Sequence, residues 1–166
     1  MTKSGFLKLV NTPLRFRFFM LWKLPSAWFM GIGLRYCDGK RSEVILPYGW
    51  RSQNPFRSTY FAAQCAAAEL STGILALAAL QEQAPVSMLV TNIEAEFKKK
   101  ASQTLLFTCE EGDSLESVIR SAVESGEARQ FRAVSVGTLP DGTEAVRVWV
   151  SWSFKLKKAG ADSSGL

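Results

Sequence analysis

The chain has 166 residues, of which 47% are hydrophobic and 21% are charged, so it can form one domain with a sizeable core, and wholesale disorder is excluded. It contains no histidine, which excludes Ser-His-Asp and Cys-His triads and histidine-ligated metal sites, and we expect no metal site. The net charge of +5 comes from lysines and arginines spread along the chain, which predicts a basic surface without a nucleic-acid partner, the alternative being a site for an acidic ligand.

The cysteines indicate the redox compartment. The chain has three cysteines, an odd number: Cys37, Cys65 and Cys109. Two of the three lie in apolar segments. This pattern is typical of reduced thiols, so we expect a cytoplasmic protein without disulfides. No glycine-rich phosphate loop of either standard pattern occurs in the sequence.

The N-terminal segment, residues 12–34, is basic and aromatic. Two arginines, a lysine and a proline interrupt it before about 18 apolar residues accumulate, so no apolar run in it is long enough for a transmembrane span. Thr12 followed by Pro13 predicts a helix over 13–22, which a Leu-Pro pair ends. We expect residues 1–28 to form a helical extension packed on the domain or on a partner subunit, the alternative being a membrane-surface anchor.

A hairpin and a long helix follow. The patterns at 29–35 and 43–46 predict two strands joined by an Asp-Gly turn. The helix of about 22 residues begins at Ser58 or Thr59, either of which could cap its first turn. Because it is rich in alanine, other backbone can surround it closely, so it is predicted to be fully buried.

One carboxylate, Glu69, stands inside the apolar run of this helix. A buried carboxylate needs a hydrogen-bonding partner or has a raised pKa, and a group tuned in this way can act as a base near neutral pH. The structural alternative is that Glu69 pairs with an arginine or reaches a subunit interface.

The second half of the chain predicts a sheet. The predicted strands cover residues 86–100, 103–109, 129–139 and 144–157, and the first of them places Leu89, Thr91, Ile93, Ala95 and Phe97 on its buried face. A surface helix interrupts them, with Asp113 and Glu116 as a capping box and Gly126 at its end. The order predicts an α+β fold in which a curved antiparallel sheet, residues 29–158, surrounds one helix, followed by a disordered tail at 159–166.

The spacing of three sites in the sequence resembles the hotdog-fold acyl-CoA thioesterases, especially the phenylacetate-pathway type. Asn54, Tyr60-Phe61-Ala62 and Glu69 fall where that group has an asparagine, a His-Gly-Gly at the start of the central helix and an acidic residue. The N-terminal helix and the helix after Gly112 are similar to an uncharacterised hotdog branch. The resemblance implies the hotdog fold for residues 29–158.

The resemblance also implies site roles. Glu69 would be the general base or nucleophile that attacks a thioester. Asn54 would hold the attacking water or shape the pocket, the alternative being a turn residue only, because Asn-Pro commonly opens a loop. The backbone amides of Phe61 and Ala62, at the helix start, would polarise the thioester carbonyl.

Tyr60, Ser58 and Arg57 are the predicted substrate-binding residues. Tyr60 stands where the family has its histidine, and Phe61 and Ala62 stand where it has two glycines, whose lack of side chains lets a ligand approach closely.

The family further implies a homodimer, or a dimer of dimers, that pairs through its sheets and places the site between subunits. The substrate would be an acyl-CoA, with coenzyme A as part of the substrate and no cofactor. Arg57 and Lys98 to Lys100 could form a basic rim for its phosphates, or could be solvated cations only. Two other functions stay open: a non-catalytic carrier of acyl or lipid ligands, and a peripheral membrane protein.

Overall fold

A six-stranded antiparallel sheet and five helices make up the described chain, which covers residues 1–157 of this computed structural model. The helices are α1 (Lys3–Val10), α2 (Pro13–Lys23), α3 (Pro25–Phe29), α4 (Phe61–Ala79) and α5 (Gly112–Ser125). The strands are β1 (Gly33–Cys37), β2 (Ser42–Leu46), β3 (Val86–Phe97), β4 (Leu105–Cys109), β5 (Arg129–Thr138) and β6 (Glu144–Leu156). The tail predicted at 159–166, and Lys158 at the predicted end of the domain, lie outside the described residues.

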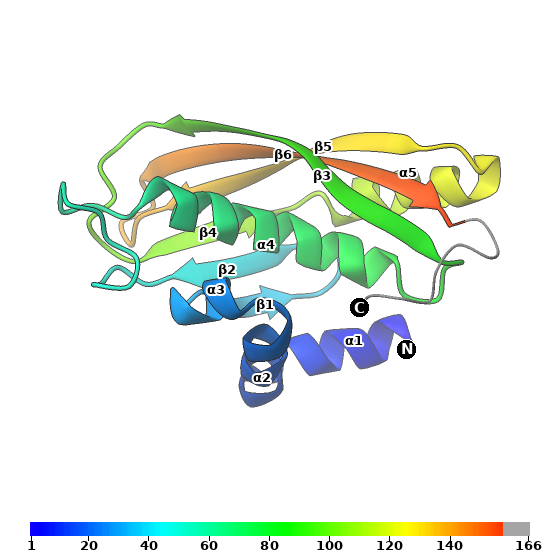
Figure 1. Ribbon diagram of the computed structural model, residues 1–166, viewed down its shortest axis with the longest axis horizontal. Coiled ribbons are helices and arrows are strands. Elements are labelled where there is room, and N and C mark those ends of the chain that lie inside the picture. The colour runs from blue at the N-terminus through cyan, green and yellow to red at the C-terminus, as the bar shows by residue number, and fades with distance from the viewer. Residues whose placement is uncertain (158–166) are drawn as a thin grey trace.

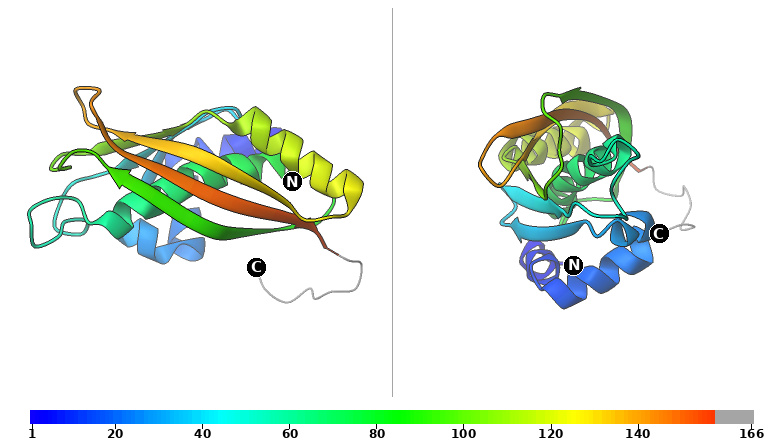
Figure 2. Two further views of the ribbon diagram at one scale, coloured as in Figure 1. Left: turned by 90° about the horizontal axis from the view of Figure 1, so that it is seen from above. Right: turned by 90° about the vertical axis from the view of Figure 1, so that its left-hand side faces the viewer.

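The sheet has the strand order β1-β2-β4-β5-β6-β3 and curves around α4 (Figures 1 and 2). The predicted curved antiparallel sheet around one long helix is therefore confirmed. The two edges of the sheet are β1 and β3. Within residues 1–157, β3 pairs only with β6, so its other edge has no strand partner.

Helix α4 is buried because its side chains are small. Most of its residues are buried, and several alanines have no exposed surface. At Gly73, a side chain would stand 3.3 Å from the ring of Trp152, so glycine lets the indole pack against the helix. The helix is long and apolar enough to cross a membrane, but 67% of its 18-residue apolar stretch is buried inside the fold. The central position of the helix is confirmed, but the prediction that it is fully buried is wrong for its first half, where Phe61 is 56% exposed and Cys65 and Glu69 are only half-buried.

Buried hydroxyl groups connect α4 to the sheet. The Ser71 and Ser135 hydroxyls lie 2.7 Å apart, and Ser42 donates to the carbonyl of Ser71 at 2.6 Å. The indole N–H of Trp152 donates to Thr72 at 3.0 Å. Each of these core polar groups is hydrogen-bonded, which keeps the cost of its burial low.

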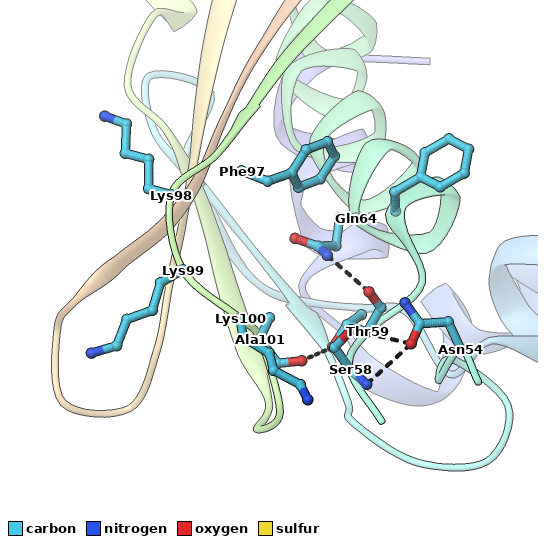
Figure 3. Close-up of a pocket in the computed structure, with 10 residues that line it drawn as sticks. Asn54, Ser58, Thr59, Gln64, Phe97, Lys98, Lys99, Lys100 and Ala101 are labelled. Atoms are coloured by element: carbon cyan, nitrogen blue, oxygen red, sulfur yellow. Dashed lines mark hydrogen bonds between the residues drawn. The ribbon is translucent and has the colours of Figure 1, made fainter. Parts of the chain in front are cut away.

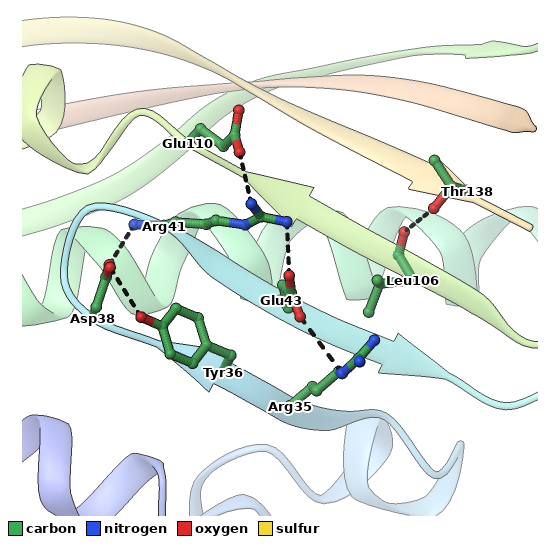
Figure 4. A network of polar contacts seen from close by, with 8 residues as sticks. All are labelled: Arg35, Tyr36, Asp38, Arg41, Glu43, Leu106, Glu110 and Thr138. Atoms are coloured by element: carbon green, nitrogen blue, oxygen red, sulfur yellow. Dashed lines mark hydrogen bonds and ion pairs between the residues drawn. The ribbon is translucent and has the colours of Figure 1, made fainter. Parts of the chain in front are cut away.

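The polar outer surface of the β1-β2-β4 region carries an ion-pair network (Figure 4). Glu43 on β2 contacts Arg41 at 2.7 Å and Arg35 at 3.6 Å, and Arg41 also reaches Glu110 at 3.2 Å. The charged side chains that alternate with core residues such as Val44 and Leu46 thus pair with one another on the solvent side.

The N-terminal segment contains more helix than the sequence predicts. The helix predicted at 13–22 is present as α2, but α1 precedes it and α3 follows it. The predicted strand at 29–35 is wrong for its first part, because Phe29 ends α3 and β1 begins at Gly33. The Asn11 side chain bonds both the N–H and the carbonyl of Cys37, at 3.0 and 2.6 Å, which fixes the helices against β1.

Both predicted helix caps are wrong. Helix α4 begins at Phe61 with Tyr60 as its N-cap, because Thr59 instead bonds the carbonyl of Ala101 through its N–H at 2.7 Å. Helix α5 begins at Gly112, before the predicted capping box, and Glu116 binds Lys3 at 2.5 Å. Gly126 ends α5 in a left-handed conformation with φ of 70°, as predicted.

The faces of β3 also differ from the prediction. A bulge between Val90 and Asn92 adds one residue to the strand and changes the phase of its alternation. Before the bulge the inward residues are Val86, Met88 and Val90, so Leu89, predicted to be buried, is 63% exposed.

Candidate functional site

An open apolar cleft of about 640 Å³ lies between the first half of α4 and the end of β3. Its lining comprises Phe61, Ala62, Cys65, Ala66, Glu69, Ile93, Ala95 and Phe97. The α4 residues recur every three or four positions, so they share one face of the helix. The β3 residues alternate along the strand after the bulge. Glu69 is the single carboxylate of this lining.

Glu69 is half-buried, and its carboxylate has no partner among residues 1–157. None of the ion pairs or side-chain hydrogen bonds formed within residues 1–157 uses its carboxylate oxygens. Burial raises the pKa of Glu69, because water stabilises the charged form less there. The alternative in which Glu69 pairs with an arginine is therefore not observed among the described residues.

The start of α4 supplies free backbone amides at one end of the cleft. The first amides of an α-helix have no intrahelical acceptor, and no carbonyl of the described residues accepts from Phe61 or Ala62. The helix dipole adds partial positive charge at this end. The predicted role of these two amides toward a thioester carbonyl stays a prediction.

Tyr60 lies beside the cleft rather than in its lining. Its ring meets that of Phe61 edge to face at 4.9 Å, and it is 44% exposed. Its backbone N–H donates to the carbonyl of Ser52 at 2.7 Å. Its predicted contact with substrate stays a prediction.

A second pocket of about 350 Å³ adjoins the cleft and shares Phe61 and Phe97 with it (Figure 3). Asn54 lines this second pocket, and its side-chain oxygen accepts from the N–H of Phe56 at 3.0 Å and from Ser58. The structure thus places Asn54 and Glu69 in neighbouring pockets, not in one. The Asn54 oxygen is engaged in holding its own loop.

The other predicted binding residues belong to the same loop. Ser58 lines the second pocket, and its hydroxyl donates to Asn54 at 3.1 Å. Arg57 is exposed, has a left-handed φ of 55° and lines neither pocket, and its N–H closes a turn to the carbonyl of Asn54 at 3.1 Å. The structure brings Ser58 and Asn54 together and leaves Arg57 at the surface.

The lysines of the predicted basic rim lie on the side of this pocket opposite Asn54, whereas Arg57 is not part of the lining, and their role toward phosphates stays a prediction. Lys98, Lys99 and Lys100 all line it, and Lys98 and Lys99 project outward from the end of β3 (Figure 3). Lys98 binds Glu144 at 2.7 Å. Lys99 and Lys100 form no ion pair with another described residue.

Two features of the site were missed by sequence reasoning. Gln64 lines the second pocket and donates from its side chain to the carbonyl of Thr59 at 3.0 Å, and its signal was a polar residue one turn from the start of an apolar helix. Glu144 binds Lys98. Hydrogen bonds from Arg147, which have the larger effect, and from Lys98 lower the pKa of Glu144 to about 2. No pattern in the sequence indicated that pairing.

Cys65 is a half-buried member of the cleft lining. Burial raises the pKa of its thiol, which disfavours the thiolate that a nucleophilic cysteine needs. Among residues 1–157, no group of three or more cysteines and carboxylates is placed to hold a metal ion. The chemistry available in the cleft is therefore that of one carboxylate and a helix N-terminus.

The family model described as "Domain of unknown function (DUF4442)" matches residues 14–153. Among curated proteins, none matches the sequence.

Solved structures share the fold at low sequence identity. A protein with unknown function from Chlorobaculum tepidum has a TM-score of 0.72 at 15% identity, covering 89% of this chain and 99% of its own. A thioesterase from Haemophilus influenzae has a TM-score of 0.66 at 11% identity, covering 91% and 95%. A thioesterase family protein from Silicibacter pomeroyi has a TM-score of 0.62 at 13% identity, covering 85% and 96%. The predicted hotdog fold is confirmed.

Proposed function

We propose that this chain, which belongs to the DUF4442 family and has the hotdog fold found in thioesterases, hydrolyses an acyl thioester with Glu69 as the general base or nucleophile. The observation that carries the proposal is a half-buried carboxylate without a partner among residues 1–157, facing an apolar cleft. Burial raises the pKa of this carboxyl and so shifts it toward the range in which a general base works best.

The acyl chain would occupy the cleft and its carbonyl would lie at the start of α4. Apolar side chains line the cleft apart from Glu69, which suits a hydrocarbon or aryl chain. The free amides of Phe61 and Ala62 would stabilise the negative charge that develops on the carbonyl oxygen. In one route Glu69 takes a proton from the attacking water, the carbon–sulfur bond breaks, the thiolate leaves with that proton, and the free acid is the other product. In the other route Glu69 itself attacks and displaces the thiol, and water then hydrolyses the acyl-enzyme anhydride to the free acid and restores Glu69.

Coenzyme A is the proposed thiol because a basic pocket adjoins the cleft. Lys99 and Lys100, which form no ion pair within the described chain, could hold its phosphates. Phe61 and Phe97 line both pockets, so one elongated substrate could extend from the cleft to the lysines.

Glu69 and the helix start of the same chain are separated by about two helical turns, which favours a site shared between two chains. The separation of Ala62 and Glu69 in sequence corresponds to a rise of about 10 Å along an α-helix, whereas a hydrogen bond spans about 3 Å. Two copies with antiparallel α4 helices would bring Glu69 of one copy to the helix start of the other. We therefore propose a homodimer with shared sites, and a dimer of dimers would preserve them.

Strand β3 supports this pairing. Its outer edge has no strand partner within the described sheet, and Ile93 and Phe97 on it are 42% and 50% exposed. An unprotected edge strand with exposed apolar side chains is a template for pairing with another chain. Pairing of two β3 strands would join the two sheets and place the two clefts at the dimer interface.

The first test is release of free thiol from a panel of aryl-CoA and fatty acyl-CoA thioesters, followed by complementation. Glu69→Gln lacks the base, and Phe61→Pro lacks one amide. Proline suits the first helical position, and Tyr60 is already extended, with ψ of 133°. We expect each variant to be inactive alone and coexpressed mixed dimers to regain activity, because one site then combines the intact amide with the intact carboxylate.

Phe61→Ala keeps the amide and serves as the control for the lost ring. If the mixture stays inactive while wild type is active, the site lies within one chain and the dimer proposal is wrong. If wild type releases no thiol from any thioester, the hydrolase proposal is wrong. In that case a carrier is indicated, for which native mass spectrometry should show a retained acyl or lipid ligand.

A further inference from the structure

The outward face of α2 is apolar, whereas the exposed face of a surface helix is normally polar. Phe16 and Met20 point inward and are buried. The outward residues are Leu14, Phe18, Leu21 and Trp22, with exposed fractions of 66%, 64%, 43% and 83%. At 3.6 residues per turn they form one arc about 100° wide.

Cations border this arc on both sides. Arg15 lies at one border of the arc and Arg17 at the other. Both are exposed, and neither forms an ion pair with another described residue. The Arg17 guanidinium lies 5.9 Å from the Trp28 ring centroid. All charged side chains before Asp38 are lysines or arginines, so no acidic residue of this segment neutralises them.

The fold keeps this face away from β3. Helix α2 contacts α3 and β1, and β1 is the opposite edge strand of the sheet from β3 (Figure 1). A partner on α2 would therefore leave β3 and the Glu69 cleft accessible.

We propose that the α2 face, defined by Leu14, Arg15, Arg17, Phe18, Leu21 and Trp22, docks onto an anionic lipid surface. The apolar arc would enter the boundary between headgroups and acyl chains, and the flanking arginines would extend to lipid phosphates. A second copy of the chain fits poorly, because the docked faces would bring cations together without acidic partners.

The test is flotation of the full chain with vesicles of phosphatidylcholine alone or mixed with phosphatidylglycerol, at low and high salt. We expect binding to the anionic vesicles, weakened by salt. Phe18→Ser with Trp22→Ser should weaken binding about a hundredfold, because two large side chains lose their burial in lipid. Arg15→Gln with Arg17→Gln should weaken it about thirtyfold.

The controls make the same chemical changes elsewhere. Phe56→Ser removes a loop side chain that is 77% exposed, and Arg120→Gln with Lys155→Gln removes two exposed cations from α5 and β6. Both should bind vesicles as wild type does. All the replaced side chains are exposed, and far-ultraviolet circular dichroism with the thermal unfolding midpoint should show an unchanged fold.

Three outcomes would overturn the proposal. The first is no binding to anionic vesicles at low salt, and the second is equal binding by the α2 variants and the controls. The third is a smaller oligomer for Phe18→Ser with Trp22→Ser when wild type does not float, which would assign the face to a second copy. Hydrolysis of a water-soluble thioester is independent of all three.

Discussion

Glu69 is close in sequence to Ser71 and Thr72 in α4, but its side chain differs from theirs in whether its polar group is hydrogen-bonded. Ser71 and Thr72 are fully buried, and their hydroxyls bond to Ser135 and Trp152. Glu69 is half-buried and its carboxylate bonds to no other residue of the 1–157 segment. A buried polar group with partners connects the helix to the sheet, whereas one without partners can still form hydrogen bonds to a ligand.

The comparison predicts its largest effect at Glu69. Glu69→Gln should lower kcat/KM for a thioester by about a hundredfold or more, because a positioned base contributes 10²–10⁴-fold. Ser71→Ala should leave the rate within a few-fold of wild type. Cys65→Ala, in the same cleft lining, is the matched control. Unchanged thiol release by Glu69→Gln would remove this carboxylate from the mechanism.

The hydroxyl pair should affect stability instead of activity. Ser71→Ala leaves the buried Ser135 hydroxyl without its partner and should lower the free energy of unfolding by about 1–3 kcal/mol. Ser71→Ala combined with Ser135→Ala should cost less than the sum of the two single changes, because neither partner is then left unpaired. Urea unfolding of the two single variants and the double variant measures this, with Ser114→Ala, at an exposed position of α5, as the control. Strict additivity would show that the two hydroxyls are not coupled.

The raised pKa of Glu69 predicts how stability depends on pH. Between the pKa of the unfolded chain and the higher pKa of the folded chain, the folded state binds more protons, so its stability falls as pH rises. Glu69→Gln should be as stable as wild type below that window and more stable above it. Thermal unfolding of both proteins from pH 4 to 8 is the measurement. A variant less stable than wild type at pH 8 would mean that the carboxylate has a stabilising partner.

The smallest effect is expected at the basic rim. Lys99→Ala with Lys100→Ala should raise KM for an acyl-CoA about three- to tenfold with kcat unchanged, because exposed charges each contribute about 1 kcal/mol or less. An N-acetylcysteamine thioester, which has no phosphate, should show no change. Lys155→Ala with Lys157→Ala, at the other end of the sheet, is the control. An equal rise for both substrates would place the phosphates elsewhere.

Much of this architecture could be predicted because its signals are local. The alanine-rich run around Ala67 predicts a closely surrounded helix, and the alternation from Val146 to Phe154 predicts a strand with one buried face. These patterns depend on the period of the element itself. Glu69 could be singled out for the same reason, since a charge inside an apolar helix is visible without coordinates.

The missed features depend on residues distant in the sequence. Thr59 is a good cap by residue type, but its N–H and hydroxyl bond Ala101. The bulge of β3 arises from its pairing with β6 and changes which residues face α4. No local pattern reports on either contact, because a cap or a register is chosen by competition with tertiary partners.

The sequence by itself determined the class of the fold and the presence of one acid in a buried helix, because residue size and hydrophobic period act over a few neighbours. The tertiary structure alone decided that this acid is unpaired within residues 1–157 and faces a cleft. It also decided that the apolar arc of α2 with Phe18 and Trp22 points outward, while Phe16 and Met20 are buried. Both outcomes depend on which surfaces the packed sheet covers, and that is a property of the assembled fold.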